Sequence, residues 1–273
     1  MTFNEEDNIS DCLMAINHAG FNSIRIYDGG STDQTISIVQ SDFPNVKVSS
    51  TNLSLSARRK LAIEECPTEF IFFVDADQRV FQYDYEQIID RNFQSGVAGI
   101  QFLKVLPEKT LTSYWQRGFA IRNRIIQGNN PIKKVIGTPC IYSCEVLRKF
   151  NYSEKVDSAA DDTSVGHLLG QNSFHFLAIN EKAIEIFRPS WMGTARKAFW
   201  YGLGDAEFVG STETTRSRIN HLFHVFCRNP LLYPVQSLKF GPVYFPFLIF
   251  FGFTRLMGFL VGITNSKVKL LKS

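Results

Sequence analysis

The apolar positions in the first part of the chain switch repeatedly between a helical spacing and short continuous runs. Ile9, Cys12, Leu13 and Ile16 share one helix face, and Gly20 ends that stretch. The pattern predicts helices at residues 7–19, around Ile36, at 56–66 and at 85–93, and strands at 23–27, 43–48, 70–74 and 97–103. Because strands and helices alternate with short loops, we expect an α/β fold with a parallel, doubly wound sheet.

The run Phe70–Val74 carries no charge and ends at Asp75-Ala76-Asp77. A short run rich in aromatic and branched residues is typical of a strand that is buried on both faces of a parallel sheet. Residues two apart in a strand point the same way, so the carboxylates of Asp75 and Asp77 can converge where the strand ends. Adjacent carboxylates repel unless a cation lies between them, and a divalent ion suits them. The alternative is a solvated acidic turn, and spacing alone does not decide between the two.

A second candidate loop follows the strand predicted at 23–27, where Asp28-Gly29-Gly30-Ser31 leads into a helix. A strand that enters a helix through two glycines exposes backbone N–H groups to whatever docks there.

Charge divides the chain into two parts. Residues 188–273 hold 11 Lys/Arg against 3 Asp/Glu, a net charge of +8, which leaves −5 on residues 1–187 because the whole chain carries +3. An acidic body with a basic, aromatic tail favours attachment to an anionic surface. The cations of the tail interleave with long apolar runs, so we expect no nucleic acid as a partner.

The tail contains one long apolar stretch, Phe240–Ile263, which only Arg255 interrupts with a charge. It is long enough to span a bilayer. Pro242, Pro246 and Arg255 equally favour two shorter segments that dip into one leaflet, with the arginine snorkelling to the headgroups. Lysines follow the stretch and favour a cytoplasmic end. We therefore expect a membrane surface as a partner and a location on the cytoplasmic face; the alternative is a helical pair packed on the domain.

The chain resembles family 2 glycosyltransferases in four segments that keep the family's order and spacing. These segments are Thr2-Phe3-Asn4-Glu5-Glu6, Asp28-Gly29-Gly30-Ser31-Thr32-Asp33, Ala57-Arg58-Arg59 and Asp75-Ala76-Asp77. The family has the GT-A fold, a Rossmann-like and mostly parallel twisted sheet with flanking helices, and transfers a sugar from a nucleoside diphosphate with inversion. The resemblance implies a GT-A catalytic domain at residues 1–187, followed by membrane-associated amphipathic helices at 188–273.

The resemblance also implies a donor site for a UDP- or GDP-sugar with Mg²⁺ or Mn²⁺. It assigns Asp28 to the base, Thr2 and Glu5 to base and ribose, Arg58 to the phosphates, Asp75 to ribose and metal, and Asp77 to the metal. Simpler alternatives remain open, because Asp28 can cap a turn, Arg58 can be a solvated helix residue, and Glu5 can favour a helix dipole.

Further along, Asp161-Asp162 resembles the family's Glu-Asp motif at a helix start, with Asp161 in the glutamate position. The resemblance implies that Asp162 is the general base that deprotonates the acceptor hydroxyl. The acceptor we expect is a glycan or a lipid-linked precursor of a surface polysaccharide. The alternative is that both aspartates only cap the helix.

One departure from the family concerns the strand that normally precedes the Thr2 segment, because only Met1 stands there. Three readings follow: a misassigned start site, a fold that tolerates the loss, or a degraded copy. The function we predict is an inverting, metal-dependent glycosyltransferase, and the alternative is an inactive nucleotide-sugar-binding or scaffold protein. A nucleotidyltransferase would need a glycine- and arginine-rich phosphate loop near the amino end, which this sequence does not have.

Overall fold

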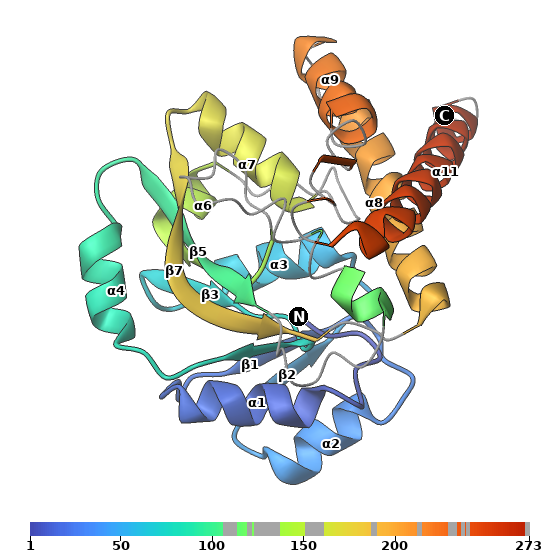
Figure 1. Cartoon of the computed structure of the whole chain (residues 1–273). Helices are drawn as coiled ribbons and strands as arrows, with labels where there is room; N and C mark the ends of the chain where they lie inside the picture. Colours follow the sequence, from blue (N-terminus) through green and yellow to red (C-terminus); the bar gives the residue numbers. More distant parts are fainter. Residues whose placement is uncertain are drawn as a thin grey trace. The chain divides into compact units, whose positions relative to one another are not determined.

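A computed structural model of the chain describes residues 1–105, 114–118, 122, 137–150, 161–186, 190–211, 215–228, 234–235, 238 and 241–270 (Figure 1). The chain forms two compact units. Unit 1 takes in Met1–Leu106, Asn129–Glu154 and Val165–Ile186, and unit 2 takes in Pro107–Gly128, Lys155–Ser164 and Phe187–Ser273. The predicted division into a catalytic domain and a membrane-associated region stays a prediction.

Unit 1 alternates strands and helices in the predicted order. Its elements are α1 (Ile9–His18), β1 (Arg25–Asp28), α2 (Thr35–Asp42), β2 (Lys47–Ser50), α3 (Leu55–Glu64), β3 (Phe70–Phe73), β4 (Gln78–Val80), α4 (Tyr85–Asn92), β5 (Val97–Val105), β6 (Cys140–Ser143), α6 (Cys144–Lys149) and β7 (His175–Glu185). Helix α7 (Asp161–Gln171) begins in unit 2 and ends in unit 1. The predicted helices and strands therefore form within a few residues of their expected bounds, and the short β4 is an addition.

The strands form two sheets with mixed directions. β1 and β2 pair in parallel, and a five-stranded sheet has the order β3-β6-β5-β7-β4. In this larger sheet β5 and β7 are parallel, whereas the other three pairs are antiparallel. The expectation of a parallel, doubly wound sheet is therefore wrong for most of the larger sheet. One reason is local and concerns β4, which starts only a few residues after β3. A crossover that keeps two strands parallel needs a dozen residues or more, so β4 runs opposite to β3 and pairs antiparallel with β7.

The larger sheet is covered on both faces. One apolar cluster joins it to α3, α6 and α7 through residues that include Ile63, Leu147 and Leu169. A second cluster joins it to α4 through Ile88 and Phe102. The prediction that β3 is buried on both faces is wrong, because only Phe73 of its four residues is buried. The reason is its position at the edge of the sheet, beside a cavity of about 490 Å³.

Met1 and Thr2 connect the two sheets at their edges. The Thr2 N–H donates to the Tyr27 carbonyl at 3.2 Å, and the Thr2 carbonyl accepts from the Gly29 N–H at 3.0 Å. On the other side, the Met1 amine donates to the Val74 carbonyl at 3.1 Å, and the Met1 carbonyl accepts from the Ala76 N–H at 3.3 Å. Both patterns are those of a parallel ladder. These two residues therefore act as a short strand between β1 and the end of β3.

Unit 2 contains α8 (Trp191–Ser211), α9 (Thr215–Leu222), the π-helix η2 (Phe223–Arg228), the 3₁₀ turn η3 (Pro242–Tyr244) and α11 (Phe245–Leu270). Helices α8 and α11 cross closely because glycines stand at the contact. A Cβ on Gly202 would lie 2.0 Å from the Arg255 carbonyl oxygen, and one on Gly258 would lie 2.1 Å from that of Phe199. Small residues at these two places therefore set the distance between the helices.

Arg255 turns inward between these helices. Its guanidinium donates to both carboxylate oxygens of Asp205 on α8, at 2.6 and 2.8 Å, and Asp205 also contacts His221 Nε2 at 2.8 Å. Burial by itself raises the pKa of Asp205, but Arg255 and His221 outweigh it, so that pKa is lowered. The alternative in which Arg255 snorkels to the headgroups is therefore wrong, because a buried carboxylate 50 residues earlier in the chain provides its partner.

Replacing Asp205 by Ala should destabilise unit 2 by about 3 kcal/mol, because Arg255 then stays buried without its carboxylate. The three tryptophans, Trp115, Trp191 and Trp200, all belong to unit 2, so their fluorescence during urea unfolding reports on this unit. As a matched control, the double change Asp205→Leu with Arg255→Met should recover most of the loss. Unfolding of Asp205→Ala at the wild-type urea concentration would contradict this role of the ion pair.

Candidate active site

The amino-terminal segment and the loop after β1 are joined by hydrogen bonds in both directions. The Asn4 N–H donates to Ser31 Oγ and the Thr32 N–H donates to Asn4 Oδ1, both at 2.8 Å. The Glu5 N–H donates to Thr35 Oγ1 at 2.8 Å, while the Glu5 carboxylate accepts from the nearby Asn8 side chain. Two of the resemblance segments thus form one continuous structure.

Asp28 ends β1 and is 1% exposed. Its carboxylate accepts from the N–H groups of Gly30 and Ser31, each at 2.9 Å, and from Ser31 Oγ at 2.5 Å. Gly30 has a φ of +85°, a conformation that favours glycine. These contacts show that Asp28 caps the turn after β1, which was the simpler alternative. The contact of Asp28 with a nucleotide base stays a prediction.

Arg58 lies on the buried face of α3 and holds the amino-terminal segment against β1. Its Nη1 donates to the Thr2 carbonyl at 2.9 Å and to the Tyr27 carbonyl at 3.2 Å. The guanidinium passes so close to Gly29 that a Cβ there would lie 2.7 Å from it. Burial lowers the pKa of Arg58, and the Asp28 carboxylate opposes that effect. The alternative of a solvated helix residue is therefore excluded.

Asp75 lies one turn beyond β3 and faces the next arginine of α3. Arg59 Nη2 lies 3.8 Å from Asp75 Oδ1, and the Thr138 hydroxyl donates to the other oxygen. Burial raises the pKa of Asp75, but the Arg59 guanidinium, the Met1 ammonium and the Thr138 hydrogen bond together lower it overall. Arg59 was not among the predicted site residues, although its place beside Arg58 in Ala57-Arg58-Arg59 pointed to it.

Asp77 follows in the same turn, which ends before β4. Its backbone carbonyl accepts from the Ile186 N–H at 2.7 Å, and its side chain is half-buried. Because β3 ends at Phe73, the alternation of a strand does not decide where the carboxylates of Asp75 and Asp77 point. Among the described residues, no group of three or more His, Cys, Asp or Glu forms a ready metal site.

Asp161 and Asp162 begin α7, as predicted. The positions of their side chains lie outside what the structure describes, so the role of Asp162 as general base stays a prediction. The capping alternative for these two aspartates is equally untested.

The structure thus brings five predicted or neighbouring site residues into one network at the carboxyl ends of β1 and β3: Thr2, Asp28, Arg58, Arg59 and Asp75. Arg58 and Arg59 are both buried and fixed by contacts, and two guanidiniums at one edge favour binding of phosphate oxygens. Ligands of α/β proteins commonly bind at this edge of the sheet.

Comparisons with known proteins identify the family and the fold. The sequence model of the family described as Glycosyl transferase family 2 matches residues 1–156. The SPbeta prophage-derived glycosyltransferase SunS of Bacillus subtilis (strain 168) is 35% identical over 79 residues, which is 28% of this chain and 18% of that protein. Glycosyltransferase SunS of Bacillus phage SPbeta matches to the same extent. The matched stretch is thus less than a fifth of the length of these curated relatives.

Solved structures show the same fold. Mannosyltransferase PcManGT from Pyrobaculum calidifontis, in complex with GDP-Man and Mn²⁺, has a TM-score of 0.66 at 13% identity, covering 95% of this chain and 85% of that one. S. aureus TarS 1–349 in complex with UDP-GlcNAc has a TM-score of 0.55 at 15% identity, covering 98% and 90%. The predicted GT-A fold class is therefore confirmed, although the directions within the larger sheet are mixed.

The change Asp75→Asn should destabilise unit 1 by about 1 kcal/mol at pH 7, because Arg59 and the Met1 ammonium lose a charged partner. The folded-state pKa of Asp75 is lowered, so its contribution is complete above the ordinary aspartate value of about 3.9 and disappears as the pH falls through the folded value. Thermal unfolding followed by circular dichroism from pH 7 to pH 3 measures this. The exposed Asp90 provides the control Asp90→Asn, and a wild-type advantage that is equal at pH 3 and pH 7 would contradict the assignment.

Proposed function

Since the chain belongs to glycosyl transferase family 2, we propose that it moves a sugar from a nucleoside-diphosphate sugar to a hydroxyl acceptor with inversion at the anomeric carbon. The observation that carries the proposal is the network of Thr2, Arg58, Arg59 and Asp75, in which two buried guanidiniums face the same edge as the acidic turn. Such an edge suits a diphosphate, because planar guanidiniums pair with phosphate oxygens in a fixed geometry.

The reaction we propose is a single displacement. The oxygen of the acceptor hydroxyl forms a bond to the anomeric carbon while the bond from that carbon to the diphosphate oxygen breaks. The hydroxyl proton goes to the Asp162 carboxylate, and the nucleoside diphosphate leaves with the bonding electron pair. Arg58 and Arg59 hold the diphosphate, Thr2 and Glu5 flank the nucleoside, and Asp161 supports the acceptor side.

The residues present fit a divalent ion that the donor shares. Mg²⁺ commonly binds through one or two carboxylates together with substrate phosphates, rather than in a cage made by the protein alone. Asp75 and Asp77 supply two carboxylates, and the described residues contain no larger cluster of metal ligands. A bound Mg²⁺ or Mn²⁺ would neutralise charge on the leaving diphosphate. PcManGT, which shares the fold, was solved with GDP-Man and Mn²⁺, which supports this expectation.

The acceptor we propose is a glycan or a lipid-linked precursor at the cytoplasmic face of a membrane. Pro242–Thr264 is long and apolar enough to cross a bilayer, judged by length and composition. Helix α11 presents Ile249, Phe253, Met257 and Leu260 as exposed side chains at helical spacing. An exposed apolar stripe in a basic region is typical of a helix that lies against lipid.

A second function is an inactive nucleotide-sugar-binding or scaffold protein. Two observations favour it: the three hydrogen bonds that Asp28 already accepts, and the cavity beside β3. The first reduces the capacity of Asp28 to contact a nucleotide base, and the second leaves space beside the strand that leads to the acidic turn.

The purified protein should hydrolyse one donor slowly from a panel of UDP- and GDP-sugars with Mn²⁺, and EDTA should stop the release. Asp77→Asn and Asp162→Asn should each lower transfer by about 100-fold or more, because a charge at the metal or at the base is lost. Asp90→Asn, on the exposed face of α4, is the matched control. Full activity of either site variant would remove that residue's role, and nucleotide binding without any turnover would favour the inactive alternative.

The protein should also float with phosphatidylglycerol-containing vesicles, and the double change Phe253→Ser with Leu260→Ser should reduce that binding, because it removes apolar area from the exposed stripe. Leu53→Ser changes an exposed leucine of unit 1 and should leave flotation unchanged. Equal flotation of the wild type and the α11 variant would contradict contact through this helix.

A further inference from the structure

Cys66 and Cys144 are far apart in the chain, but the fold of unit 1 brings their thiols together. Cys66 stands between the end of α3 and the start of β3, and Cys144 is the first residue of α6. Both are free thiols. Their spacing matches no cysteine motif, so only the structure identifies them as a pair.

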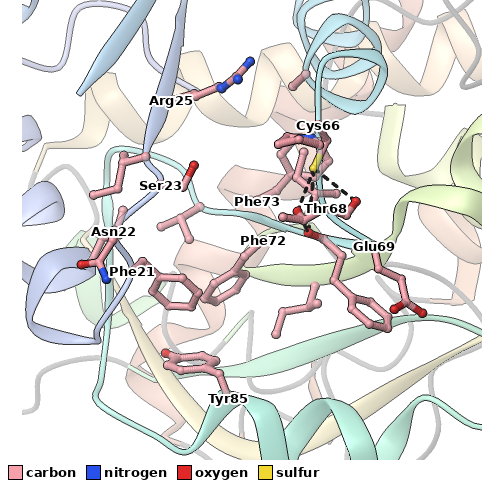
Figure 2. A pocket seen from close by; sticks show the side chains of 18 of the residues that line it. Phe21, Asn22, Ser23, Arg25, Cys66, Thr68, Glu69, Phe72, Phe73 and Tyr85 are labelled. Atoms are coloured by element: carbon pink, nitrogen blue, oxygen red, sulfur yellow. Dashed lines mark hydrogen bonds between the residues drawn. The ribbon is translucent and has the colours of Figure 1, made fainter. Parts of the chain in front are cut away.

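The pairing of β3 with β6 places both sulfurs at the start of β3. The last residue of β6 pairs with Phe70, and one step beyond it the Cys144 N–H donates to the Glu69 carbonyl at 2.8 Å. Figure 2 shows the Cys66 sulfur beside the same turn, 3.2 Å from Thr68 Oγ1 and 3.8 Å from the Phe70 carbonyl oxygen. The Cys144 thiol donates a hydrogen bond to the Cys66 sulfur.

The two thiols differ in exposure. Cys144 is 0% exposed, whereas Cys66 is partly exposed and is followed by three exposed residues, Pro67, Thr68 and Glu69. A small dissolved oxidant therefore reaches the Cys66 sulfur, while Cys144 is in contact only with its neighbours in the fold. Oxidation of cysteine follows exposure and thiolate character, so Cys66 is the sulfur that reacts first.

Arg148 fixes a positive charge beside Cys66. It lies one helical turn after Cys144 on α6, and its Nε and Nη2 donate to the Ile63 carbonyl at 3.1 and 2.9 Å. Its Nη2 also donates to the Cys66 carbonyl. The guanidinium thereby holds the carboxyl end of α3 against α6 and stays close to the Cys66 side chain.

These surroundings give the two thiols opposite tendencies. Burial by itself raises the pKa of the Cys66 thiol, but hydrogen bonds from Thr68 and from the Cys144 thiol oppose that effect. Together with the nearby Arg148 guanidinium they lower the pKa of Cys66 overall. Burial, with the adjacent Cys66 thiol, raises the pKa of Cys144 to about 12. Cys66 is therefore the nucleophile, and Cys144 keeps its proton.

We propose that Cys66 is an oxidation site for hydroperoxides and that Cys144 is its resolving cysteine, so that the two form a reversible disulfide. The Cys66 thiolate attacks one oxygen of hydrogen peroxide; an S–O bond forms, the O–O bond breaks, and hydroxide leaves with the bonding electron pair. The Cys144 sulfur then attacks the sulfenic acid on Cys66. An S–S bond forms, the S–O bond breaks, and the departing hydroxide takes the Cys144 proton and leaves as water. The two sulfurs lose two electrons, which the peroxide gains.

The disulfide links α3 covalently to α6. Helix α3 carries Arg58 and Arg59, and in the reduced protein its carboxyl end is held to α6 by the hydrogen bonds of Arg148. A covalent link at the same place closes a long loop of the chain and restricts the unfolded state. Oxidation therefore restrains the helix that carries the two buried arginines.

The first test maps the cysteines of the full chain after treatment with hydrogen peroxide. The wild type should form one disulfide between the peptides that contain Cys66 and Cys144, and dithiothreitol should reverse it. Cys66→Ser should leave Cys144 reduced, while Cys144→Ala should stop at a sulfenic acid on Cys66 that dimedone labels. The control Cys227→Ser changes an exposed cysteine of unit 2 and should form the same disulfide as the wild type. Two unreacted thiols in the wild type, or oxidised Cys66 that is not linked to Cys144, would overturn the proposal.

The second test measures thiol reactivity without any oxidant. Iodoacetamide at pH 7 should label Cys66 of the native wild type about tenfold faster than Cys144, or more. Arg148→Gln should slow the labelling of Cys66 by about threefold, because the thiolate loses a nearby positive charge. Lys149→Gln removes the neighbouring exposed charge of α6 and is the matched control, with no change expected. Equal labelling of the two cysteines, or an unchanged rate in Arg148→Gln, would contradict the roles assigned to them.

The third test measures the effect of the bond on the fold. Oxidation should raise the melting temperature of the wild type by about 5 °C or more, because the disulfide closes a long loop. Hydrogen exchange at residues 55–66 should become slower, and peroxide-treated Cys144→Ala should show neither change. An unchanged or lower melting temperature would mean that the sulfurs meet only in an opened state, which would overturn the proposal. None of these tests uses donor turnover, so each outcome is independent of whether the protein is an active transferase.

Discussion

Met1 and Thr2 hold unit 1 together at the edge that carries the candidate site residues. Met1 and Thr2 make ladder hydrogen bonds to β1 on one side and to the end of β3 on the other, and they are the connection between the two sheets there. Arg58 reinforces this connection, because one nitrogen of its guanidinium donates to both the Thr2 and the Tyr27 carbonyls. The position of the donor-site candidates relative to one another therefore depends on the backbone of Met1 and Thr2.

At this edge Arg59 is more deeply buried than Asp75, the acid that it faces. Arg58 and Arg59 are 7% and 4% exposed, whereas the Asp75 side chain is 33% exposed. The Asp28 carboxylate accepts hydrogen bonds from the turn that follows β1, so it does not neutralise Arg58 by direct contact. A site with fixed guanidiniums and an accessible carboxylate favours a ligand that brings both negative charge and a metal, as a nucleoside-diphosphate sugar does.

Local patterns predicted the elements of this structure, and long-range pairing accounts for what they missed. The apolar run at Phe70 predicted a strand, but no local signal shows that β6 returns antiparallel beside it. β4 is three residues long and includes Arg79, so no apolar pattern marks it. The resemblance segments identified Arg58, while the partners that fix it are carbonyls, which carry no sequence signal. One of the two alternatives for the tail placed Arg255 at the headgroups, because no local pattern points to its partner Asp205, which lies 50 residues away.

The inward ion pair changes what α11 can present to its surroundings. A charged residue in an apolar stretch normally argues against contact with lipid, since desolvating an unpaired charge is costly. Here both charges lie between α8 and α11, and glycines allow those helices to approach closely enough to enclose them. The outer side of α11 is left with exposed apolar residues. Buried ion pairs contribute little net stability, so we infer that this one mainly fixes the rotation of α11, with Arg255 inward and Phe253 outward.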